Sequence, residues 1–131
     1  MKVNTKKATG RVLDYLAAKA VGDLAEQGGQ VHVVNGALRY YEDTLDEPYS
    51  PSTNWSQGGP ICEMKGIFPF LASLKREEGK IVFNKSYGAK TPTMLFWLEH
   101  PVYADEPLVA AMRCLAASTF GDEAEVPDEL C

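Results

Sequence analysis

The dipeptide Asn35-Gly36 restricts the possible folds of this chain more than any other local feature. Asn-Gly is the preferred pair for a two-residue type I′ turn, because both residues adopt positive φ at low cost. The flanking segments 31–34 and 37–41 are rich in Val, Leu and Tyr, so the sequence predicts a β-hairpin. A two-residue turn also sets the register, and the predicted cross-strand pairs are Val31–Tyr40, His32–Arg39, Val33–Leu38 and Val34–Ala37.

Side chains alternate along these two strands, which gives the hairpin a core face and an outer face. We expect the apolar residues of the pairs Val31–Tyr40 and Val33–Leu38 to pack on the core. His32 and Arg39 then lie together on the outer face. A histidine beside an arginine can bind an anion, or it can be an exposed polar pair, and we favour the exposed pair.

Two stretches carry apolar residues at helical spacing. The first predicts a helix from about residue 9 to residue 26, ended by Gly28-Gly29. The second predicts a helix over about 106–120, with Asp105 as its N-cap and Gly121 as its end.

Three further segments have the composition of strands, and they are 67–74, 80–83 and 93–98. Pro69 restricts the first to an edge or bulged position, because proline cannot donate a hydrogen bond to a neighbouring strand. Turn residues at 77–79 predict a second hairpin. The expected fold is therefore α+β in two layers, with an antiparallel sheet of four or five strands and the N- and C-terminal helices packed on one face.

A chain of 131 residues is long enough for one domain with a single core, so we expect one domain over residues 1–131. Its last segment, 122–131, contains Asp and Glu residues but no basic residue. We expect this acidic tail to be flexible, because like charges repel one another and favour solvent.

Composition disfavours several classes of function. No apolar run approaches the roughly 20 residues that span a bilayer, and the N-terminus lacks the apolar region of a signal peptide. The 3 cysteines are too few and too widely spaced for a disulfide framework or a zinc site, so we expect a cytoplasmic protein with no membrane association. A net charge of -5 makes nucleic-acid binding unfavourable, because phosphates would be repelled.

The segment from Tyr49 to Pro60 combines turn-forming residues, hydroxyls, amides and one tryptophan. Gly58-Gly59-Pro60 predicts a tight turn into a short helix that spans about Pro60 to Lys65. None of these residue types performs acid, base or metal chemistry by itself, so we expect no catalytic residue, no metal and no cofactor. Either Trp55 fills the edge of the core, or the segment presents it to a partner. The candidate binding residues are Ser52, Asn54, Trp55, Gln57, Gly58 and Gly59.

The acidic segment that precedes this motif, residues 42–48, carries four carboxylates. Carboxylates so close together can bind a hard cation such as calcium. Their spacing does not match an EF-hand loop, which needs ligands at alternating positions and a central glycine. We interpret the segment as a solvated loop.

Three parts of the chain resemble the NinX-type phage proteins, a family of small proteins encoded by tailed phages and prophages. These parts are Tyr49–Ile61, Thr9–Asp14, and Pro107–Cys114 together with Phe120–Glu123. The resemblance covers nearly the whole chain. It implies an accessory role for a phage inside an infected bacterium, and it carries over no catalytic residue, because the family has none established.

Two functional hypotheses follow. In the first, the protein is a non-enzymatic binding module that docks on a host or phage protein through Tyr49–Pro60, which requires an exposed Trp55. In the second, it is an enzyme or a nucleic-acid-processing accessory whose site must gather its polar groups in one cleft. The groups considered for that site are His32, Arg39, Asp14 and Glu42. An edge strand or an exposed aromatic loop would also allow a homo-oligomer.

Overall fold

The computed structural model describes residues 1–72, 74–83, 86–91 and 101–131. Within these ranges the α-helices are α1 (Gly10–Val21), α2 (Trp55–Lys65) and α3 (Pro107–Phe120). Two 3₁₀ turns, η1 (Ala25–Gln27) and η2 (Asp128–Leu130), follow α1 and close the chain. No helix in the described part is long and apolar enough to cross a membrane.

The strands pair antiparallel in small sheets, which confirms the α+β class. One sheet is the meander β2 (Val31–Val34), β3 (Ala37–Glu42) and β4 (Leu45–Pro48), and another has the order β5 (Phe68–Leu71), β8 (Tyr87–Lys90) and β9 (Val102–Ala104). Two-stranded pairs join β1 (Lys2–Asn4) to β10 (Glu123–Glu125) and β6 (Leu74–Glu77) to β7 (Lys80–Phe83).

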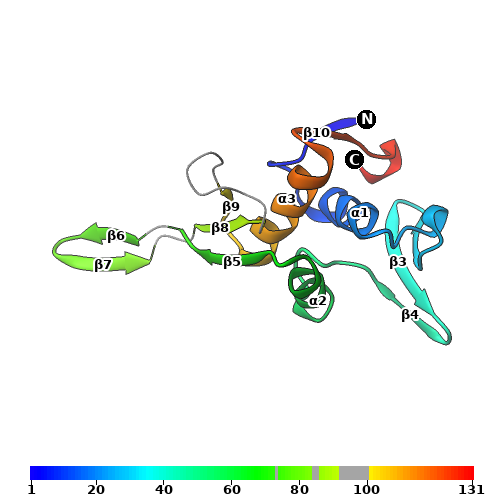
Figure 1. Ribbon diagram of the computed structural model, residues 1–131, viewed down its shortest axis with the longest axis horizontal. Helices are drawn as coiled ribbons and strands as arrows, with labels where there is room; N and C mark the ends of the chain where they lie inside the picture. Colours follow the sequence, from blue (N-terminus) through cyan, green and yellow to red (C-terminus); the bar gives the residue numbers. More distant parts are fainter. Residues whose placement is uncertain (73, 84–85, 92–100) are drawn as a thin grey trace.

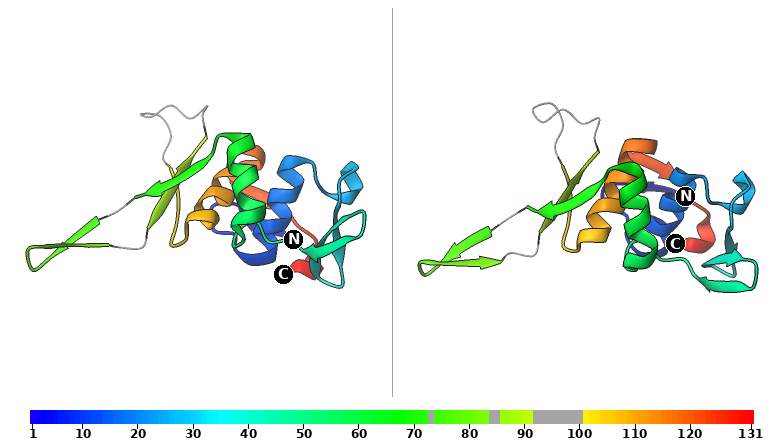
Figure 2. Two further views of the ribbon diagram at one scale, coloured as in Figure 1. Left: turned by 90° about the horizontal axis from the view of Figure 1, so that it is seen from below. Right: turned by 60° about the horizontal axis from the view of Figure 1, so that its bottom comes forward.

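These separate sheets replace the single sheet of four or five strands that we expected. Figures 1 and 2 show the reason, because the helices lie between the β2–β3–β4 meander and the β5–β8–β9 sheet. Each strand is short, and the apolar helices fill the space through which one continuous sheet would run.

The Asn35-Gly36 hairpin has the predicted register, with Val31 opposite Tyr40 and Val34 opposite Ala37. Both turn residues have positive φ, 51° at Asn35 and 75° at Gly36, as a type I′ turn requires. The second hairpin also forms, because β6 pairs with β7 around the turn at 78–79. The strand predicted over 93–98 lies outside the described residues.

The acidic segment 42–48 is not the solvated loop that we expected. It continues the hairpin through a second turn at Asp43 into β4, and Glu42 pairs with Leu45. The charged composition of this segment suggested a loop. It forms a strand nevertheless, because β4 lies at the edge of its sheet, where its carboxylates can remain solvated.

Helix α3 forms the centre of the molecule (Figure 1). It packs against α1, α2 and the β5–β8–β9 sheet, and its side chains are buried on nearly all sides. The fully or almost fully buried residues are Leu108, Ala110, Ala111, Met112, Cys114, Leu115 and Ala116. Its N-cap residue is Glu106 rather than the predicted Asp105, and Gly121 ends it as expected.

Helix α1 ends earlier than its apolar spacing predicts. Gly22 adopts a left-handed conformation with φ 78° and ends the helix after Val21, about five residues before the expected limit at residue 26. The chain then turns through η1, where Gly28 is left-handed as well. Leu24 remains buried although it lies outside the helix, because the core determines its burial rather than the helical repeat.

The C-terminal segment 122–131, expected to be flexible, instead forms β10 and η2 against the N-terminal half of the chain. Val126 and Leu130 are buried and anchor it. Arg11 binds both this segment and the hairpin, because its Nε donates to the Leu130 carbonyl at 2.8 Å and its Nη1 to the Gly36 carbonyl at 3.0 Å. Burial of these two apolar residues, pairing of β10 with β1 and the Arg11 hydrogen bond to Leu130 together hold the tail.

Helix α2 begins at Trp55, so Gly58-Gly59-Pro60 lies inside the helix and does not form the turn that we predicted. Asn54 is the N-cap, and its Oδ1 accepts a hydrogen bond from the backbone N–H of Ser56 at 2.9 Å. Gly58 is buried at a close approach, since a Cβ there would collide with the Pro51 carbonyl oxygen and lie 2.8 Å from Leu108 Cδ2. Because Gly58 has no Cβ, it allows α2 to pack closely against these neighbours, and it is not part of a loop.

This packing gives a matched pair of substitutions. Gly58→Ala should lower the free energy of unfolding by about 2 kcal/mol, because the methyl group overpacks the contact of α2 with Pro51 and Leu108. Gly59→Ala, where no atom lies near the added Cβ, should leave it unchanged or raise it by about 0.5 kcal/mol. Urea unfolding of the two variants measures both values, and equal values would contradict this account of α2.

Candidate functional site

The motif Tyr49–Pro60 is attached to the core through a buried carboxylate. Ser52 is 1% exposed, and its backbone N–H donates to Oδ1 of Asp14 on α1 at 2.8 Å. Burial raises the pKa of Asp14 to about 6, and hydrogen bonding from Ser52 opposes that rise. Asp14 is therefore an internal anchor for the motif and lies away from solvent.

Gln57 fastens α2 to the end of β4. Its Oε1 accepts from the backbone N–H of Ser50 at 2.6 Å, and its Nε2 donates to the Pro48 carbonyl at 2.8 Å and to Oε1 of Glu47 at 3.2 Å. Both ends of the amide are thus occupied within the protein. Gln57 therefore holds the segment in shape.

Trp55 has the opposite environment. Its side chain is 55% exposed at the first position of α2, so it does not fill the edge of the core. The Asn54 cap and the close contact of Gly58 with Pro51 and Leu108 fix its backbone. Of the six candidate residues, Ser52 and Gly58 are buried, Asn54 and Gln57 bond internally, Gly59 is half-buried, and Trp55 presents the largest exposed apolar surface.

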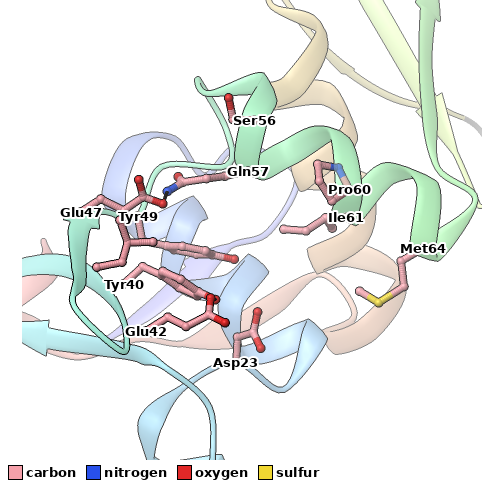
Figure 3. Close-up of a pocket in the computed structure, with 11 residues that line it drawn as sticks. Asp23, Tyr40, Glu42, Glu47, Tyr49, Ser56, Gln57, Pro60, Ile61 and Met64 are labelled. Carbon is pink, nitrogen blue, oxygen red and sulfur yellow. Dashed lines mark hydrogen bonds between the residues drawn. The ribbon is translucent and has the colours of Figure 1, made fainter.

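A cleft of about 380 Å³ opens between the β3–β4 hairpin and α2 (Figure 3). The motif contributes Tyr49, Ser56, Gln57 and Pro60 to its wall. The other lining residues are Asp23, Tyr40, Glu42, Leu45, Glu47, Ile61 and Met64. It is therefore a cleft with apolar, aromatic and acidic sides.

Two tyrosines lie across the floor of this cleft. The rings of Tyr40 and Tyr49 stack with centroids 6.5 Å apart, and the Tyr40 hydroxyl donates to Oε2 of Glu42 at 2.7 Å. That hydrogen bond raises the pKa of Tyr40 to about 12. Burial raises the pKa of Tyr49, and the charges of Asp23 and Asp14 add to the effect.

The groups considered for an enzymatic site do not converge. His32 packs edge-on against Tyr41, with ring centroids 5.1 Å apart, and it lines a separate hollow. Arg39 forms an ion pair with Asp46, its Nη2 lying 2.7 Å from Oδ1. Asp14 is buried under the motif and Glu42 faces the cleft, so a shared site for these groups is absent. No three His, Cys, Asp or Glu side chains of the described residues gather as a metal site would require.

Sequence reasoning missed most of the cleft. Tyr49 was recognised as the first residue of the motif and Tyr40 as a residue of the core face, but nothing in the pattern placed them side by side. Glu47 was assigned to a loop, and Asp23 to the end of a helix. The available signal was the turn at residues 43–44, which folds β4 back along β3 and brings Glu47 opposite Tyr40.

Comparison with known families gives one match, over residues 4–119, to the family described as Bacteriophage P22, NinX. No curated protein matches the chain. The matched range contains α1, α2, all of α3 except its last residue, the hairpin, the whole motif and every residue that lines the cleft.

The buried carboxylate of Asp14 makes a prediction about pH. Because the pKa of Asp14 rises on folding from 3.8 to about 6, the folded state binds this proton more tightly than the unfolded chain does. Its contribution to stability is therefore present below about pH 4 and is lost as the pH rises through 6. Asp14→Asn keeps an oxygen acceptor for Ser52 and removes the titration.

Between about pH 4 and pH 7 the wild type should lose about 2 kcal/mol of unfolding free energy relative to the Asp14→Asn variant. Urea unfolding at a series of pH values gives both curves. The difference between them cancels the contribution of the other carboxylates, so parallel curves would show that Asp14 does not titrate in this range.

Proposed function

The chain belongs to the Bacteriophage P22 NinX family and is a phage accessory protein, and from that premise we propose that it is a non-enzymatic binding module. Its partner is a host or phage protein, and the contact surface is the Tyr49–Pro60 segment with Trp55 at its centre. Exposure of Trp55 on a fixed helix start is the observation that carries the proposal.

Exposing more than half of a tryptophan side chain to water is unfavourable in free energy, and protein interfaces use such side chains as anchors. An anchor residue needs an exposed side chain and a fixed backbone, and Trp55 has both. The hydrogen bonds of Ser52 to Asp14, of Ser56 to Asn54 and of Gln57 to its neighbours hold the start of α2. A partner would therefore lose little conformational entropy by binding there.

The alternative, a nucleic-acid-processing accessory or enzyme with a site near His32 and Arg39, has less support. Arg39 is already neutralised by Asp46, and His32 lies against Tyr41. The cleft on the inner side of the hairpin carries carboxylates, which repel a phosphate backbone. We propose that the protein binds its partner inside the infected bacterium. That partner can also be a second copy of this chain, which would make the protein a homo-oligomer.

Trp55→Ala should abolish capture of the partner by the purified protein and leave the fold intact. The exposed indole contributes little to the core, so the free energy of unfolding should change by less than about 0.5 kcal/mol. A pulldown from lysate of infected host cells, read by mass spectrometry, compares wild type and variant.

Phe68→Ala is the matched control, because Phe68 is 60% exposed but lies on β5, away from the motif. The control should retain the partner. A protein captured equally by wild type and Trp55→Ala, and lost with Phe68→Ala, would move the contact surface to the β5–β8–β9 sheet and contradict the proposal.

A further inference from the structure

The charged side chains that line the cleft beside Trp55 are all acidic. Its lining includes the carboxylates of Asp23, Glu42 and Glu47, and none of its described lining residues is Lys, Arg or His. Glu42 and Glu47 each accept one hydrogen bond from within the protein, from Tyr40 and Gln57. A carboxylate can accept about four hydrogen bonds, so acceptor capacity remains on both.

The second observation is the hydroxyl of Tyr49. The Tyr49 side chain is only 6% exposed, and its hydroxyl oxygen is buried without a hydrogen-bond partner among the described residues. Figure 3 shows this hydroxyl directed into the cleft, between Ile61 and Asp23. Buried polar groups are nearly always hydrogen-bonded, so an unpaired hydroxyl beside a cleft indicates a partner group that binds there.

We propose that this cleft binds the side chain of an arginine carried by the partner protein. The inference rests on the proposed function, because it names the chemistry that the partner presents next to Trp55. The guanidinium group enters between β4 and α2, donates N–H groups to Glu42, Glu47 and the Tyr49 oxygen, and leaves its methylene groups against Leu45 and Met64.

Arginine fits this cleft better than lysine. Its planar group has five N–H donors in fixed directions, whereas an ammonium is a compact charge. The carboxylates of the cleft lie on different elements, with Glu42 on β3, Glu47 on β4 and Asp23 between α1 and η1. The stacked pair Tyr40 and Tyr49 adds aromatic surface that attracts a flat cation.

The position of the cleft also fits a single partner surface. Ser56 and Gln57 line the cleft and directly follow Trp55 on α2. In this proposal one partner surface covers the exposed indole and places its arginine against the acidic wall. Charge complementarity of this kind selects partners and orients them during the encounter.

The test uses purified protein and two blocked amino acids, N-acetyl-arginine N-methylamide and its uncharged isostere N-acetyl-citrulline N-methylamide. In a two-dimensional NMR titration, the arginine compound should shift the backbone amides of residues 40–49 and 55–64. The citrulline compound should bind at least about tenfold more weakly, because it lacks the charge that strengthens the hydrogen bonds.

Glu42→Gln tests the wall directly, since glutamine can still accept the Tyr40 hydroxyl. Asp43→Asn is the matched control: it removes the same charge one residue away, does not line the cleft, and asparagine tolerates the positive φ of 51° at that turn. Glu42→Gln should weaken arginine binding by about tenfold, and Asp43→Asn by less than about twofold.

Three outcomes would overturn the inference. They are equal binding of the arginine and citrulline compounds, equal loss in Glu42→Gln and Asp43→Asn, and tighter binding of free spermidine than of the arginine compound, which would make the ligand a polyamine. Failure here is separable from failure of the proposed function, because loss of the partner on Trp55→Ala would still identify the motif as its contact surface.

Discussion

The burial of α3 is the constraint on which the rest of the structure depends. This helix is apolar on nearly all sides, so it needs neighbours all round to remove that surface from water. Helix α1, helix α2 and the β5–β8–β9 sheet supply them. The β5–β8–β9 sheet covers only one side of this helix, so α1 and α2 cover other sides, and the β2–β3–β4 meander lies beyond α1 (Figure 1).

The candidate site is held by the same packing. Leu108 of α3 lies against Gly58, which sets the distance of α2 from the core, and Asp14 of α1 holds Ser52. Asn54 caps α2, Gln57 binds the end of β4, and the backbone N–H of Ser52 binds Asp14, so these groups serve the structure of the motif. The surface that remains for recognition is Trp55 and the acidic wall contributed by the hairpin.

Several local features could be predicted from a few residues, although the N-cap of α3 and the end of α1 at Gly22 were not. The Asn35-Gly36 turn gave the correct register, and Gly121 ended α3 where expected. Predictions that depended on distant contacts did less well. Gly58-Gly59 suggested a turn because glycine disfavours the helical conformation. The Asn54 cap and the close approach of Pro51 and Leu108 to Gly58 nevertheless stabilise a helix there.

The sequence by itself determined the α+β class, the main hairpin, both long helices and the family, because turn chemistry, helical spacing and an extended motif are all local patterns. Only the tertiary structure decided that Trp55 is exposed, that the acidic tail is anchored, and that Tyr40, Tyr49, Glu42 and Glu47 share one cleft with α2. Exposure and convergence depend on which surfaces are left uncovered once α3 is buried, and that is a property of the whole packing arrangement, which no short stretch of sequence contains.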